Sequence, residues 1–164
     1  MSADLGWLPE LLRFEDYSGC WSRYEAALYE CFYRDFLASS PTFEGRRVGV
    51  KKKPYEKGKE AAFWHLVSAG RCESTRKVDL RRCERIAWPR SMIDAAGTRC
   101  VRTWTNNRGR EQRAVIALPD FSYAVILALR DGYALLWTAY CVDREHTRRK
   151  MMRECAQRGE AEKG

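Results

Sequence analysis

Histidine is the residue type best suited to proton transfer near neutral pH, and this sequence has two. His65 lies in the apolar segment AAFWHLVS, residues 61–68, just after a lysine-rich stretch. An imidazole there could act as a general acid or base, although a lone histidine in an apolar strand is more often structural. His146 falls in the first turn of an expected C-terminal helix, where we interpret it as a surface residue. His65 is therefore the candidate acid–base group.

Guanidinium groups that could hold a phosphate crowd a short predicted helix, at Arg81, Arg82 and Arg85. Arginine binds phosphate bidentately and stays charged at any working pH, but arginines also commonly cover exposed helix surfaces. Hydroxyl groups occur on the apolar strand YALLWTAYCV, where alternation places Thr138 and Tyr140 on one face with Leu136. Trp137 is expected on the opposite face. The hydroxyl pair could complete a phosphate pocket or merely hydrogen-bond locally.

Positive charge is concentrated in the middle of the chain. The 164 residues carry 30 Lys and Arg against 22 Asp and Glu, a net charge of +8, and residues 46–113 hold 19 of these bases against seven acids. A basic stretch with interleaved aromatics is typical of a polyanion-binding protein. A base could stack on an exposed aromatic such as Tyr55 or Trp88. The expected backbone-binding residues are Lys51, Lys53, Lys57 and Arg81.

Motifs of several common enzyme classes are absent from the sequence. No GxSxG, HExxH, GxGxxG or P-loop pattern occurs, and the acids of residues 46–142 are too sparse for a two-metal nuclease. The seven cysteines form no CxxC pair, so we expect reduced thiols, no metal site and no cofactor. A metal-independent ribonuclease needs only proton transfer and cations around a phosphate, since RNA supplies its own 2′-hydroxyl nucleophile.

These candidate residues must be positioned by a mixture of helices and strands. An apolar stripe predicts a helix over residues 20–39, made by Trp21, Tyr24, Leu28, Phe32 and Phe36. Helical patterns also cover residues 80–87, ending at Pro89, then 91–96, and the segment from Asp143 to about residue 156. Strands are predicted over residues 46–53, 61–68, 99–105, 113–118, 123–129 and 133–142. A turn signal at residues 106–109 and the Asp131-Gly132 pair predict two hairpins among the last four strands.

The order of these elements predicts an α+β fold, with N-terminal helices packed on an antiparallel sheet of four or more strands and a C-terminal helix. Residues 1–17 form a lead-in, residues 18–156 a single domain, and residues 157–164 a flexible tail. The longest apolar run, residues 133–142, is too short to span a membrane. No signal peptide pattern is present, so we expect a cytoplasmic protein.

The segments GKEAAFWHLVS, DLRRCERIAW and YALLWTAY, in this order, resemble the phage-associated branch of the barnase–EndoU–colicin–RelE ribonuclease superfamily. The resemblance covers roughly residues 20–156. It implies a RelE- or barnase-like domain and a metal-independent endoribonuclease, often a toxin or a phage–host conflict effector. Carried over by motif, His65 would be the acid–base group and Arg82 or Arg85 would hold the phosphate. Thr138 and Tyr140 would complete the pocket.

The expected reaction is attack of the RNA 2′-hydroxyl on the adjacent phosphorus, which gives a 2′,3′-cyclic phosphate. RNA, with tRNA among the candidates, would be the substrate, and an antitoxin or immunity protein a potential partner in a bacterial or phage-infected cell. The alternative is a non-enzymatic basic nucleic-acid-binding protein, or a phage accessory or inhibitor protein, on the same scaffold. The acidic N-terminal region would contact a basic partner or shield the basic groove.

Overall fold

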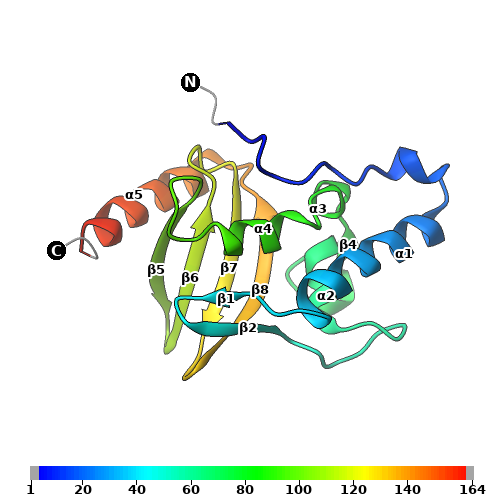
Figure 1. Cartoon of the computed structure of the whole chain (residues 1–164), viewed down its shortest axis with the longest axis horizontal. Helices are drawn as coiled ribbons and strands as arrows, with labels where there is room; N and C mark the ends of the chain where they lie inside the picture. The colour runs from blue at the N-terminus through cyan, green and yellow to red at the C-terminus, as the bar shows by residue number, and fades with distance from the viewer. Residues whose placement is uncertain (1–3, 162–164) are drawn as a thin grey trace.

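A curled six-stranded sheet forms the centre of the protein and carries helices on both faces (Figure 1). This is a computed structural model that describes residues 4–161. The strand order is β1-β2-β8-β7-β6-β5, antiparallel throughout except that β2 pairs in parallel with β8. The strands are β1 Thr42–Phe43, β2 Arg46–Val50, β5 Arg102–Arg108, β6 Glu111–Ala117, β7 Tyr123–Leu129 and β8 Tyr133–Cys141. The predicted α+β class is confirmed.

Four helices cover one face of the sheet, and the C-terminal helix covers the other. They are α1 Trp21–Phe32, which continues as a π-helical segment Tyr33–Leu37, then α2 Ala61–Val67, α3 Leu80–Glu84 and α4 Trp88–Asp94, and finally α5 Glu145–Ala161. Short elements complete the chain: 3-10 turns Phe14–Tyr17 and Glu73–Thr75, and a two-stranded sheet of β3 Ser68–Ala69 and β4 Lys77–Val78. Residues 157–161, expected in the tail, are part of α5.

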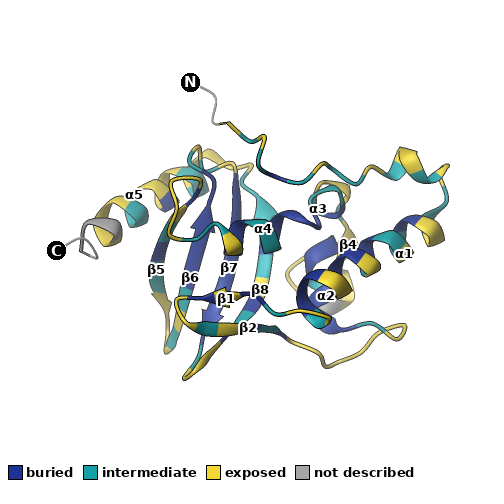
Figure 2. Ribbon diagram, viewed as in Figure 1, coloured by how far each residue is buried: buried dark blue, intermediate teal, exposed yellow. Residues whose placement is uncertain are grey.

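Each face of the sheet has its own apolar core (Figure 2). The larger core lies under α1–α4 and contains the expected stripe of α1, with Tyr24, Leu28 and Phe32 almost completely buried. The smaller core lies under α5, where Met151 packs near Trp104 and Ile126. Because both faces are covered, β7 is buried along its whole length, which explains its nearly continuous apolar sequence.

The segment that carries His65 is a helix, so the predicted strand over residues 61–68 is wrong. Burial in α2 follows a helical spacing, with Phe63, Leu66 and Val67 facing the larger core. A short apolar run has no periodicity that separates a strand from a buried helix. The alanine pair at residues 61–62 favours the helix, because alanine has the highest helix propensity.

The N-terminal lead-in is built into the larger core. Leu8 is buried, the Trp88 indole donates a hydrogen bond to the carbonyl oxygen of Pro9 (2.9 Å), and Tyr24 donates one to that of Leu12 (2.6 Å). The amide of Leu12 also donates to the carbonyl oxygen of Glu84 at 2.9 Å. Removing residues 1–17 would therefore expose the core, and would not simply uncover a basic groove.

Stability should fall in alkali because two thiols are buried. Burial raises the pKa of both Cys31 and Cys83 from 9.0 to about 12. Since the folded state disfavours the thiolate, this contribution is complete below pH 9 and is lost as the pH rises toward 12. We expect the free energy of unfolding, measured in urea, to decline above pH 9. Cys83→Ala should reduce the slope of this decline with pH by up to about 1.4 kcal/mol per pH unit.

Candidate nucleic-acid interface

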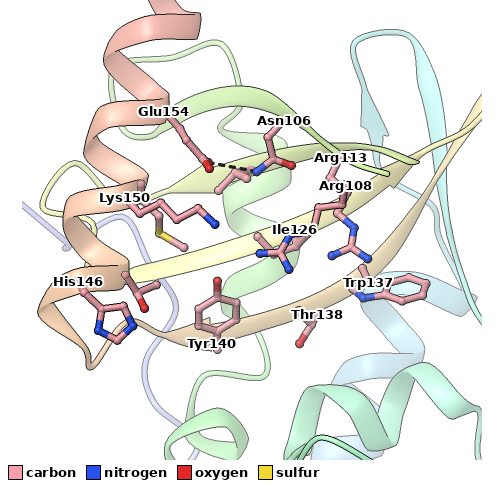
Figure 3. A pocket seen from close by; sticks show the side chains of 13 residues that line it. Asn106, Arg108, Arg113, Ile126, Trp137, Thr138, Tyr140, His146, Lys150 and Glu154 are labelled. Atoms are coloured by element: carbon pink, nitrogen blue, oxygen red, sulfur yellow. Dashed lines mark hydrogen bonds between the residues drawn. The ribbon is translucent and has the colours of Figure 1, made fainter. Parts of the chain in front are cut away.

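A cleft of about 360 Å³ lies between α5 and the sheet face beneath it (Figure 3). We call it the α5 cleft. Its walls come from strands β5 to β8 on one side and from the first turns of α5 on the other. The ionisable side chains that line it are Arg108, Arg113, Tyr140, His146, Lys150 and Glu154. Residues distant in sequence thus form one polar, predominantly cationic site.

Two cations of the cleft have no neutralising carboxylate among the residues that the structure describes. Within residues 4–161, neither Arg108 nor Lys150 forms an ion pair. Arg113 differs, because its guanidinium binds Glu111 at 2.8 Å. The Glu154 carboxylate accepts hydrogen bonds from the side chains of Trp104 (3.1 Å) and Asn106 (3.2 Å). Arg108 and Lys150 therefore remain available to an anionic ligand.

The Tyr140 hydroxyl points into the same space. Figure 3 shows it directed between the side chains of Lys150 and Arg108. It makes no hydrogen bond within the part of the chain that the structure describes. Burial raises the pKa of Tyr140, while Arg108 and Arg82 act in the opposite direction. The hydroxyl is consequently protonated at neutral pH and can donate a hydrogen bond to a phosphate oxygen.

A β-bulge in β8 alters which side chains face the cleft. Ile126 pairs with Thr138, but the next residue of β7, Leu127, pairs with Leu136, so Trp137 is the additional residue. Leu136 is buried in the larger core, whereas Trp137 joins Thr138 and Tyr140 at the cleft. The expected grouping of Leu136 with the hydroxyls is therefore wrong. Strict alternation cannot anticipate a bulge, a feature common beside functional sites.

Arg82 lies beside the predicted hydroxyl pair but is mainly engaged by backbone groups. Its Nη1 donates to the carbonyl oxygens of His65 (3.1 Å) and Ser68 (2.7 Å), and more weakly to Thr138 Oγ1 (3.5 Å). The guanidinium carbon is 6.0 Å from the Tyr140 ring centre. These contacts join the C-terminal end of α2 to the part of β8 that extends beyond its pairing with β2. Arg82 thus acts as a positioning residue for the wall of the cleft.

The His65 side chain lies outside the α5 cleft. It lines a smaller neighbouring hollow of about 80 Å³ together with Lys51, Ala62, Leu136 and Trp137. We call this the His65 hollow. Trp137 lines both spaces, so they are adjacent along β8. The predicted general acid–base residue is therefore near the cationic cleft but separated from it by an indole ring.

The other predicted arginines and the predicted stacking tryptophan do not line the cleft. The Arg85 guanidinium lies over the Trp88 ring, 5.0 Å from its centre. Trp88 is only 9% exposed, so it cannot present a free face to a base, and its proposed stacking role is wrong. Arg81 forms an ion pair with Asp143 at the surface. Arg81, Arg85 and Trp88 are therefore engaged with other protein groups away from the cleft.

The predicted lysines lie on the exposed segment between β2 and α2. Lys51 reaches the His65 hollow, while Lys53 is exposed and lines neither space. Lys57 lies over the Trp64 ring at 5.8 Å. Tyr55 is 53% exposed and does not line either space. Apart from Lys51, the predicted residues of this basic segment line neither space, but they could extend a polyanion-binding surface beyond them.

His146 is the site residue that sequence reasoning misjudged. It is exposed, as expected, yet it lines the α5 cleft because α5 crosses the second face of the sheet. A usable signal was present in the spacing: His146 and Lys150 are four residues apart and share one face of a helix. Arg108 was also missed, because it was expected in a turn and instead ends β5.

Comparison of the chain with protein-family models, with curated proteins and with solved structures found no match. The resemblance to the ribonuclease superfamily therefore stays a prediction. Within residues 4–161, no three His, Cys, Asp or Glu side chains are grouped so that they could hold a metal ion. In the same range, no helix is long and apolar enough to cross a membrane.

Proposed function

We propose that the protein binds single-stranded RNA in the α5 cleft and cleaves it as a metal-independent endoribonuclease. The observation that carries the proposal is the grouping of Arg108 and Lys150 around the protonated hydroxyl of Tyr140, since neither cation has a carboxylate partner among the described residues. A phosphodiester supplies the negative charge and the hydrogen-bond acceptor oxygens that these two cations and the hydroxyl can bind. His146 supplies the one imidazole of the cleft.

The reaction uses the 2′-hydroxyl of the RNA as its nucleophile. Attack of O2′ on the adjacent phosphorus forms a 2′-O–P bond and breaks the P–O5′ bond, giving a 2′,3′-cyclic phosphate and a 5′-hydroxyl. His146 accepts the proton from the 2′-hydroxyl and, as an imidazolium, returns it to the departing 5′-oxygen. Arg108 and Lys150 neutralise the charge on the phosphorane, and Tyr140 donates a hydrogen bond to it.

One observation favours a second function, RNA binding without cleavage. The cleft holds a single imidazole, and His146 is exposed to solvent, whereas His65 lies on the other side of Trp137. The cations would still attract the phosphate backbone, with an affinity that falls as salt increases. The protein would then be a basic RNA-binding or phage accessory protein, and an antitoxin or immunity partner would be unnecessary.

Cleavage in EDTA tests the proposal. We expect purified protein to convert a short single-stranded RNA, and tRNA, to fragments ending in 2′,3′-cyclic phosphate. His146→Gln should lower the rate about 10²-fold or more, because it removes the proton-transferring group. Arg149→Gln is the matched control, since Arg149 is exposed on the same helix and does not line the cleft.

Three results would count against this function. Salt-sensitive binding without products would establish the binding protein in place of the nuclease. Full activity in His146→Gln would remove His146 from the reaction. A larger loss in His65→Gln than in His146→Gln would move proton transfer into the His65 hollow, where the sequence analysis placed it.

A further inference from the structure

Trp137, like Tyr133, is an exposed aromatic side chain of β8, but Trp137 alone of the two lines the α5 cleft and the His65 hollow. The Trp137 side chain is 37% exposed, although Leu136 and Ala139 of the same strand are buried. The β-bulge causes this exposure by adding one residue to β8 opposite Ile126 and Leu127. The indole therefore projects away from the core, at the boundary between the α5 cleft and the His65 hollow.

One side of the indole ring is already occupied. The Arg113 guanidinium lies 5.1 Å from the ring centre, and Arg113 is itself fixed by Glu111 at 2.8 Å. A cation held against an aromatic ring restricts the ring's movement and covers one face only. The opposite face remains the one on which a planar ligand can stack.

The hollow beside Trp137 adds polar groups to this surface. Lys51 contributes an ammonium group and His65 an imidazole, while Ala62 and Leu136 provide apolar contacts. A nucleobase matches this combination, because it has an aromatic face and a rim of hydrogen-bonding groups. The α5 cleft, on the other side of Trp137, holds the cations that match a phosphate.

We propose that Trp137 and the His65 hollow form a nucleobase subsite, which binds an unpaired base next to the phosphate held by Arg108 and Lys150. This inference rests on the proposed function and specifies its substrate as single-stranded. A base can stack on a side chain only when it is not paired and stacked within a duplex. The phosphate supplies most of the salt-dependent affinity, and the base supplies the preference for single strands.

Equilibrium binding of a non-cleavable ligand tests the subsite separately from catalysis. The probe is a short fluorescein-labelled 2′-O-methyl RNA, compared with its duplex and with the same strand carrying one abasic position. Trp137→Leu should weaken binding of the single strand about tenfold, the typical effect of losing one base–aromatic stack. Trp137→Phe should restore much of the affinity because it keeps a stacking ring.

Two controls make the result specific to the subsite. Tyr133→Leu removes an aromatic residue of similar exposure, 47%, from the same strand outside both spaces, and should leave the affinity unchanged. The abasic strand should bind wild type more weakly, and Trp137→Leu should weaken it no further, since the stacked base is already absent.

The failure of this subsite is distinguishable from the failure of the proposed function. Unchanged binding in Trp137→Leu, together with weaker binding in Lys150→Gln, would overturn the subsite and leave RNA binding in the α5 cleft intact. Equal affinity of wild type for the duplex and the single strand would also overturn it. If the wild-type protein binds none of the three probes, both proposals are overturned.

Discussion

Replacing Tyr140 with phenylalanine is expected to slow RNA cleavage about 10²–10³-fold, the usual effect of removing one donor that stabilises transition-state charge. The change deletes a single oxygen from a side chain whose hydroxyl has no hydrogen-bond partner in residues 4–161 and points into the cleft. No donor or acceptor in this described range loses its partner, so the melting temperature should change little. The rate loss should therefore appear without loss of stability, which thermal unfolding of the same samples would show.

The matched control for this variant is Tyr133→Phe. Tyr133 lies on the same strand, is 47% exposed and does not line the α5 cleft, so its hydroxyl should be dispensable. A cleavage rate for Tyr140→Phe within threefold of wild type would exclude Tyr140 from the reaction.

The pH dependence of this effect follows from the direction of the pKa shift. Because burial raises the pKa of Tyr140 above its ordinary value of 10.0, the hydroxyl keeps its proton throughout the neutral range. The ratio of wild-type to Tyr140→Phe rates should therefore be constant around neutral pH. It should decline only in strongly alkaline solution, where the wild-type hydroxyl ionises and its donated hydrogen bond is lost.

The antiparallel meander could be predicted from sequence because its signals are local. Asp131-Gly132 between two apolar runs marks the hairpin of β7 and β8, and the structure places it there. The hairpin of β5 and β6 was also predicted, although β5 extends to Arg108 through asparagines that were expected in the turn. Turn chemistry locates a hairpin more reliably than it locates the ends of its strands.

The site was harder to predict because it depends on long-range packing. Sequence spacing correctly paired Thr138 with Tyr140, and it drew attention to Arg82, which contacts both. It could not show that β8 contains a bulge or that α5 crosses the second face of the sheet. Those two features bring Trp137 and His146 to the cleft, and neither follows from local propensity or periodicity.

The Arg82→Leu variant is expected to lower the free energy of unfolding by about 2–3 kcal/mol, since hydrogen bonds from a charged donor are typically worth more than neutral ones. Arg82 is a strong case because its side chain is only 16% exposed and donates to the carbonyl oxygens of His65 and Ser68. Arg76 also donates to both carbonyl oxygens, at 3.3 and 2.6 Å, which limits the loss. For a chain of this size, the melting temperature should fall by roughly 4–12 °C.

Arg81→Leu provides the control one residue away. Arg81 pairs with Asp143, but both side chains are more than half exposed, at 56% and 61%, and such surface pairs contribute little. Its melting temperature should stay near that of wild type. The contrast separates two roles for Arg82. If Arg82 only positions α2 against β8, the Arg82→Leu variant should be less stable but should cleave RNA within about tenfold of the wild-type rate at low temperature, where it is folded. A loss of 10²-fold or more in cleavage with unchanged stability would instead place the Arg82 guanidinium on the phosphate, as the sequence motif alone implied.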